Sequence, residues 1–100
     1  MTSQTRSQAL PDVPTIGEFV PGYEASVWNG LVAPKNTPAE IIDKLYKEIN
    51  AALVDHEMMA RFADVGSVPK SMTPADFGNF IVEDTEKWGK IIQAANIRVD

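Results

Sequence analysis

The stretch Leu10–Pro38, LPDVPTIGEFVPGYEASVWNGLVAPKNTP, decides how the fold of this chain is interpreted. It places prolines and glycines on either side of one run that is rich in aromatic and β-branched residues, and it ends at a helix start. The Pro-Asp and Pro-Gly pairs at positions 11 and 21 are strong turn signals. Residues 1–22 are therefore predicted to form a polar lead, residues 1–9, followed by a turn-rich segment, residues 11–22.

A short helix and a strand are predicted within and just after this turn-rich segment. Thr15 and Glu18 have the spacing of a capping box, which predicts a short helix that begins after Thr15. Residues 23–33 alternate in polarity and then become mostly apolar, which favours a strand. Pro34 closes that strand, because proline has no backbone N–H to donate to a ladder.

The rest of the chain has the apolar periodicity of helices. Three helices and a short extended tail are predicted over residues 37–54, 55–65, 73–95 and 96–100. In the first and last helices a threonine is expected to act as the cap, and the proline after it suits the first helical position. Asp55 is expected to cap the second helix, and Asn96 to end the third in a left-handed conformation. On the first helix, Leu45 and Ile49 are predicted to be buried.

Length, composition and charge exclude several classes of protein. One hundred residues form at most one domain, and 44% apolar with 23% charged residues is ordinary globular composition. The net charge of -5 leaves no basic surface for nucleic acid. No apolar run approaches the roughly 20 residues that a membrane helix needs, so no membrane insertion is expected. The absence of cysteine excludes disulfides and thiol chemistry.

No constellation of residues predicts catalysis, a metal site or a cofactor. The single histidine, His56, lies beside Glu57, but without a second His or any Cys it makes a poor Zn²⁺ site. No serine has the G-x-S-x-G context of a nucleophile elbow, and no glycine-rich loop has the spacing that holds a phosphate. The chain is therefore not expected to be an enzyme.

The order LPDVPT, PGYE, W-x-G-L-x-A-P and a TP-capped helix resembles the C-terminal part of the Bug/TctC solute receptors. These are the extracytoplasmic binding proteins of tripartite tricarboxylate transport. The closing TPADFGNFIVEDTEKWGKIIQAANIRVD is similar to the last helix and tail of that family. The resemblance implies an α/β fold: a C-terminal fragment of a two-lobed, type II periplasmic-binding fold, mostly helical with one or two strands. Residues 1–100 would then be a single partial domain that begins inside a structural element, with residues 23–33 crossing between lobes.

The resemblance also implies a function, that of a solute-binding receptor for small carboxylates or amino acids. The candidate ligand contacts are Thr15, Trp28 and Asn29. Thr15 also suits a plain helix cap, and Trp28 also suits core or hinge packing. Asn29 stands where the family often has an aromatic residue. The alternative function is a stand-alone interaction or structural module that binds no ligand.

Location and assembly are the remaining expectations. The family is periplasmic, but the N-terminus MTSQTRSQALP has one arginine and no apolar core, so it is not a secretory signal. As written, the chain is expected to stay in the cytoplasm. An open strand edge and uncovered helix faces predict a homodimer, with exchanged helices as one possible form.

Overall fold

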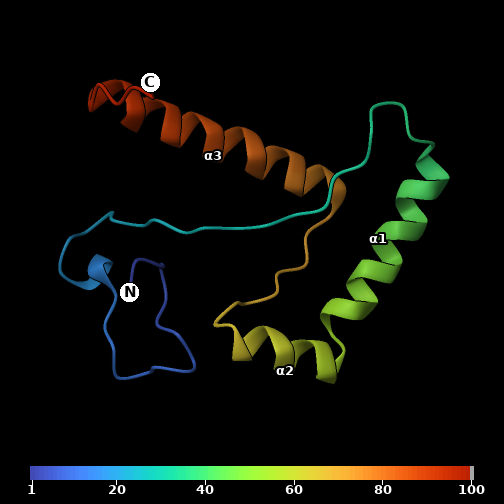
Figure 1. Cartoon of the computed structure of the whole chain (residues 1–100), viewed down its shortest axis with the longest axis horizontal. Helices are drawn as coiled ribbons and strands as arrows, with labels where there is room; N and C mark the ends of the chain where they lie inside the picture. The colour runs from blue at the N-terminus through green and yellow to red at the C-terminus, as the bar shows by residue number, and fades with distance from the viewer. Residues whose placement is uncertain (100) are drawn as a thin grey trace. The chain divides into compact units, whose positions relative to one another are not determined.

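The computed structural model describes residues 1–99, and the regular elements in this range are all helices, joined by segments without regular secondary structure. Its elements are η1 (Ile16–Glu18), α1 (Ala39–Leu53), α2 (His56–Asp64) and α3 (Pro74–Ala94) (Figure 1). The chain forms two compact units, Met1–Pro69 and Lys70–Asp100. The single partial domain expected from the sequence stays a prediction.

The turn-rich segment contains the short helix that its capping box predicts. Thr15 is the N-cap of η1 in an extended conformation, and Thr15 and Glu18 form the capping box. The element is a single 3-10 turn, which Phe19 ends. The chain then reverses through Gly22, whose φ of 84° lies in the left-handed region that glycine adopts without strain.

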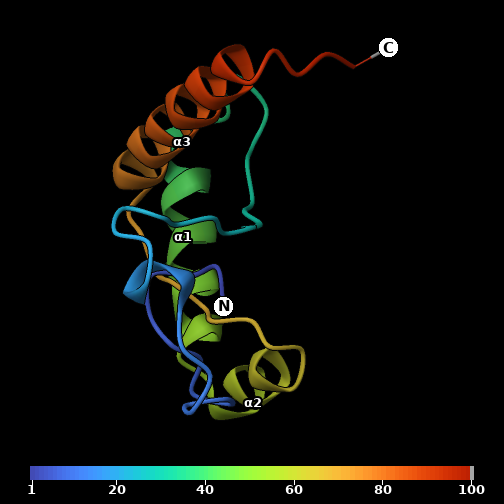
Figure 2. The same ribbon diagram turned by 90° about the vertical axis from the view of Figure 1, so that its left-hand side faces the viewer.

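The strand predicted over residues 23–33 is not formed. The segment runs extended in both views, without regular secondary structure (Figure 1, Figure 2). A strand needs a neighbour to complete its hydrogen-bond ladder, and no other described segment is a strand. Val27 is 97% exposed, which shows how little covers this run. The fold is therefore helical with no strands in residues 1–99, and the α/β character implied by the resemblance is not seen there.

Helix α1 begins without the threonine cap that its sequence predicts. Its N-cap is Pro38, which makes no side-chain hydrogen bond. The Thr37 hydroxyl donates instead to the Pro34 carbonyl oxygen, 2.8 Å away, inside a turn where Asn36 has a φ of 66°. The prediction of a Thr37 cap was wrong because the hydroxyl is already engaged in the preceding turn.

Helix α2 begins and ends as its sequence indicates. The Asp55 carboxylate accepts hydrogen bonds from the backbone N–H groups of Glu57 and Met58, both 3.1 Å away, so the predicted cap is confirmed. At the other end Gly66 adopts a φ of 68°. The Ser67 N–H then donates to the Phe62 carbonyl oxygen at 2.8 Å, which is the long bond of a Schellman motif. Helices α1 and α2 contact each other.

Helix α3 has the clearest capping signals of the chain. The Thr73 hydroxyl oxygen accepts from the Asp76 N–H at 3.1 Å, and Pro74 occupies the start of the helix. Asn96, with a φ of 51°, ends the helix in the left-handed conformation that was predicted for it. The Ile97 N–H closes a second Schellman motif on the Ile92 carbonyl oxygen at 3.0 Å. Residues 97–99 continue as a tail without secondary structure (Figure 2), and residue 100, the last of the predicted tail, lies outside the described residues.

No apolar side chain in residues 1–99 is buried. Leu45 is 48% exposed, so the prediction that it is buried was wrong, and Ile49 is only half-buried. The helices are correctly formed and amphipathic, but nothing in the described part of the chain covers their apolar faces completely. Of the helices in residues 1–99, none has the length and apolar character needed to cross a membrane.

Candidate functional site

The first residues of the chain are tied by backbone hydrogen bonds to the turn around Thr15. The Met1 ammonium donates to the Pro14 carbonyl oxygen at 2.9 Å, and the Ile16 N–H donates to the Met1 carbonyl oxygen at 2.8 Å. Thr2 then accepts from the Ala25 N–H at 2.9 Å. The lead therefore lies between the turn and the extended segment and joins them. Thr15 is 3% exposed and is the one buried residue in the described chain.

A bidentate ion pair holds the same turn from the other side. Arg6 donates from Nε to Glu18 Oε1 at 2.7 Å and from Nη2 to Glu18 Oε2 at 2.5 Å. The third guanidinium nitrogen, Nη1, donates to the Pro11 carbonyl oxygen at 3.2 Å. Glu18 Oε1 also accepts from the Thr15 N–H at 3.1 Å. One arginine thus bridges the beginning and the end of the turn, with the planar geometry that guanidinium and carboxylate share.

The ion pair fixes the charge of both partners. The Arg6 hydrogen bond, followed by the Thr15 backbone N–H, lowers the pKa of the Glu18 carboxyl to about 2. The same hydrogen bond with Glu18 raises the pKa of the Arg6 guanidinium. Glu18 is therefore ionised and bonded to Arg6 at neutral pH.

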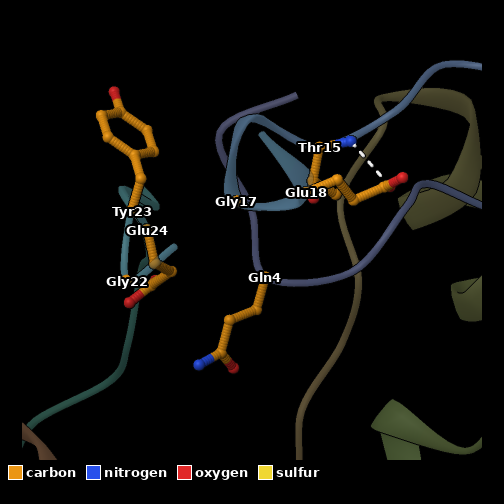
Figure 3. A pocket seen from close by; sticks show the side chains of 7 residues that line it. All are labelled: Gln4, Thr15, Gly17, Glu18, Gly22, Tyr23 and Glu24. Carbon is orange, nitrogen blue, oxygen red and sulfur yellow. Dashed lines mark hydrogen bonds between the residues drawn. The ribbon is translucent and has the colours of Figure 1, made fainter. Parts of the chain in front are cut away.

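A hollow of about 310 Å³ opens beside this turn. It is lined by Gln4, Thr15, Gly17, Glu18, Gly22, Tyr23 and Glu24 (Figure 3). Tyr23 and Glu24 lie on one side, the Thr15–Glu18 turn lies on the other, and the Gln4 side chain lies below them in this view (Figure 3). None of the lining residues is a lysine, arginine or histidine. The recognition groups are thus neutral amides and hydroxyls with two carboxylates, of which Glu18 is neutralised by Arg6.

The turn approaches the segment after Gly22 closely at Gly17. A Cβ placed on Gly17 would lie 3.1 Å from the Tyr23 carbonyl oxygen, which is tighter than an ordinary contact. Gly17 is therefore the residue that lets the two backbones meet. A side chain there would require the Tyr23 backbone or the turn to shift by a few tenths of an ångström.

Of the three predicted ligand contacts, one lines the hollow. Thr15 forms part of its wall, but its burial and its place in the capping box also fit the plain cap that was the alternative. Trp28 is 38% exposed and Asn29 is exposed, and neither is among the residues that line the hollow. Their roles as ligand contacts stay predictions.

Sequence reasoning missed most of this site. Gln4 and Arg6 were interpreted as part of a polar lead, and Tyr23 as the beginning of a strand. Arg6 and Glu18 are 12 positions apart in a segment with no periodicity, so no pattern joins them. The one available signal was chemical: Arg6 is the single charged side chain before position 12, and Glu18 is the nearest glutamate after it.

The described residues contain no group of three or more His, Cys, Asp or Glu side chains that could hold a metal ion. His56 is exposed at the start of α2. What the arrangement offers chemically is an open hollow with polar side chains and apolar surface, beside a turn that several hydrogen bonds hold.

Comparison with known proteins gives a consistent result along almost the whole chain. The family model described as tripartite tricarboxylate transporter family receptor, TctC, matches residues 1–97. A UPF0065 protein from the TAR-I ttuE-ttuC' intergenic region of Agrobacterium vitis is 38% identical over 99 residues, covering 95% of this chain and 29% of that protein. Protein BugT of Bordetella pertussis is 33% identical over 98 residues, covering 97% of this chain and 30% of BugT. No solved structure matches significantly.

The chain thus spans less than a third of the length of the curated relatives it matches. The same holds for a UPF0065 protein of Pseudomonas sp. (strain P51), from the tcbD-tcbE intergenic region. It is 34% identical, and the match covers 92% of this chain and 28% of that protein. The family match includes the lead, the turn with its ion pair and all three α-helices. The chain belongs to the tripartite tricarboxylate transporter receptor family, the Bug/TctC family.

Proposed function

We propose that this chain is the C-terminal part of a periplasmic solute-binding receptor whose ligands are small carboxylates or amino acids. The observation that carries the proposal is the match of residues 1–97 to the receptor family. The hollow beside the Thr15 turn supports it, since its lining combines apolar surface with the hydrogen-bonding side chains of Gln4 and Thr15. The two-lobed fold of the family belongs to the same proposal, because a chain this short would supply one part of it.

The ligand contacts proposed within this part are Thr15, Trp28 and Asn29. A carboxylate accepts hydrogen bonds, so it needs donors, and the lining includes the Gln4 amide beside Thr15. No lining residue is cationic, so a carboxylate would be held here by neutral donors and not by a salt bridge. Trp28 and Asn29 would contact the ligand from the extended segment.

The isolated chain is expected to bind such ligands weakly. Small-molecule sites normally bury 70–90% of a drug-sized ligand's surface, and the hollow here is lined by residues of the lead, the turn and residues 22–24 alone. Tight binding would need a second surface that closes over the ligand. We therefore place that second surface in the part of the receptor that the relatives have outside the matched stretch.

A chimera tests this function directly. The matched segment of BugT would be replaced by this chain, and both the chimera and the isolated chain would be titrated calorimetrically with citrate, succinate and glutamate. We expect at least one of these to bind the chimera, and to bind the isolated chain at least about tenfold more weakly, a difference of 1.4 kcal/mol. A folded chimera that binds none of them would overturn the proposal, and micromolar binding to the isolated chain would show that no second surface is needed.

One observation favours the alternative, a stand-alone interaction module. Apolar side chains on every α-helix are exposed, including Ile41 and Leu45 on α1 and Ile91 on α3. A second copy of the chain could cover them, giving the homodimer that the sequence suggested, with exchanged helices as one form. Sedimentation equilibrium of the isolated chain tests this. A dimer that Leu45→Glu dissociates would support the alternative, and a monomer at high concentration would remove it.

A further inference from the structure

We propose that Arg6 and Glu18 are positioning residues, whose ion pair holds the turn from Pro11 to Gly17 in the shape that forms one wall of the hollow. The proposal deepens the proposed function and rests on it, because positioning this wall matters only where the hollow holds a ligand. Arg6 does not line the hollow, and it acts through Glu18 and Thr15, which do. Glu18 holds Thr15 by accepting its backbone N–H.

The geometry connects both ends of the turn to a single guanidinium. Two Arg6 nitrogens bind the two oxygens of Glu18, at the end of the turn, and the third binds the Pro11 carbonyl oxygen, at its start. Because Glu18 Oε1 also accepts the Thr15 N–H, the carboxylate receives three donors. Releasing Arg6 would therefore free the Pro11 end and leave Glu18 with Thr15 alone.

The second ion pair of the described chain shows why this one is more than a surface contact. Arg61 and Glu57 are one helical turn apart on α2, joined by a single contact of 2.7 Å, and their side chains are 73% and 76% exposed. The α2 backbone fixes their spacing whether or not they pair. Arg6 and Glu18, 45% and 39% exposed, join two points of a segment that has no helix or ladder between Arg6 and Thr15. There the pair closes the loop together with the hydrogen bonds of Met1 to Pro14 and Ile16, and its loss returns conformational freedom to the residues between Arg6 and Glu18.

The first test follows the Thr15 amide proton by NMR as pH is lowered, in the ligand-free chain. This amide is bonded to Glu18, so its chemical shift reports the protonation of that carboxyl. We expect a midpoint at about 2 in the parent chain. Arg6→Ala should move the midpoint up toward the ordinary glutamate value of roughly 4.3, Glu18→Gln should abolish the transition, and the matched control Glu57→Gln should leave it unchanged. An ordinary midpoint in the parent, unaffected by Arg6→Ala, would overturn the proposal.

The second test separates positioning from general stability. Amide hydrogen exchange at Thr15 and Ile16 should accelerate by on the order of tenfold in Arg6→Ala, the amount expected for losing a hydrogen bond between charged groups. Exchange within α1 should not change, because α1 makes none of these bonds. The charge-reversed double variant Arg6→Glu with Glu18→Arg should restore slow exchange at Ile16 but not at Thr15, since arginine cannot accept the Thr15 N–H. Equal acceleration throughout the unit would mean a merely structural role and would refute the proposal.

The third test measures ligand binding by the BugT chimera, with citrate as the probe. Arg6→Ala should weaken citrate binding severalfold, and Glu57→Gln should not change it. If Arg6→Ala loosens the turn while citrate affinity is unchanged, the turn is not part of the binding wall and the proposal is refuted. If the chimera binds no carboxylate, the proposed function fails, and the Thr15 titration and exchange measurements still decide whether the ion pair holds the turn.

Discussion

The Thr15 turn and the start of helix α3 are both held by hydrogen bonds, but the bonded residues are much farther apart in sequence in the turn than in the helix. The turn is held by Arg6 and Glu18, 12 positions apart, and by the Met1 ammonium on Pro14, 13 positions apart. The start of α3 is held by Thr73 and Asp76, only 3 positions apart. The comparison shows that irregular backbone can be as fully specified as a helix, provided that the chain pays the entropy of closing a longer loop.

The largest expected change in the free energy of unfolding comes from replacing one of two threonines that each precede Pro-Ala. Thr73→Ala removes a hydroxyl that caps α3 and should lower the free energy of unfolding by about 1 kcal/mol, within a range of roughly 0.5–2. Thr37→Ala removes a hydroxyl that caps nothing and should cost less than about 0.5 kcal/mol. Urea unfolding followed by circular dichroism measures both. Equal losses would mean that Thr37 caps α1 in solution.

Two glycines should respond to alanine with opposite signs. Gly78 lies inside α3 with nothing within 4 Å of an added Cβ, so Gly78→Ala should stabilise the helix by about 0.8–1 kcal/mol. Gly17 lies where an added Cβ would meet the Tyr23 carbonyl oxygen at 3.1 Å, so Gly17→Ala should displace that contact and loosen the turn. Thermal melts report the first change, and amide exchange at Thr15 reports the second. A Gly17→Ala chain with slower exchange at Thr15 would contradict the close approach.

The smallest expected effect belongs to the exposed ion pair of α2. Glu57→Gln removes one contact between side chains an α-helical turn apart, which contributes roughly 0.2–0.5 kcal/mol in isolated helices. The loss should disappear in 1 M salt, where screening acts within about 3 Å. Urea unfolding at low and high salt measures the difference. A loss above 1 kcal/mol that persists in salt would show that Glu57 has a partner beyond its own helix.

The helices were the part of the fold that could be predicted from the sequence, because caps and stops are local. Asp55 and Asn96 act as their sequence context indicates. Thr37 does not, since the turn before α1 offers its hydroxyl the Pro34 carbonyl oxygen, a competitor that no cap pattern includes. The strand over residues 23–33 failed for a different reason: its composition suits a sheet, and composition cannot supply the neighbouring strand.

The candidate site was predictable only at Thr15. Its capping box is a local signal, and the hollow forms around it. Arg6 could not be assigned, because whether an isolated arginine pairs with Glu18 depends on how the loop between them closes. Burial could not be predicted from the periodic pattern either: Leu45 has the spacing of a core residue, but residues 1–99 leave it 48% exposed.

The extended run over residues 23–33 has a consequence for how long the chain survives in a cell. Proteases bind their substrates as extended backbone, and a segment without a ladder offers that conformation without prior unfolding. Val27 and Val32, 97% and 80% exposed, give hydrophobic side chains to a cleavage pocket. The capped helices must open before they can be cut. A first cleavage in this run would separate the Thr15 turn from the α-helices of residues 39–94, so a surface that covers the run would also protect the chain from that cut.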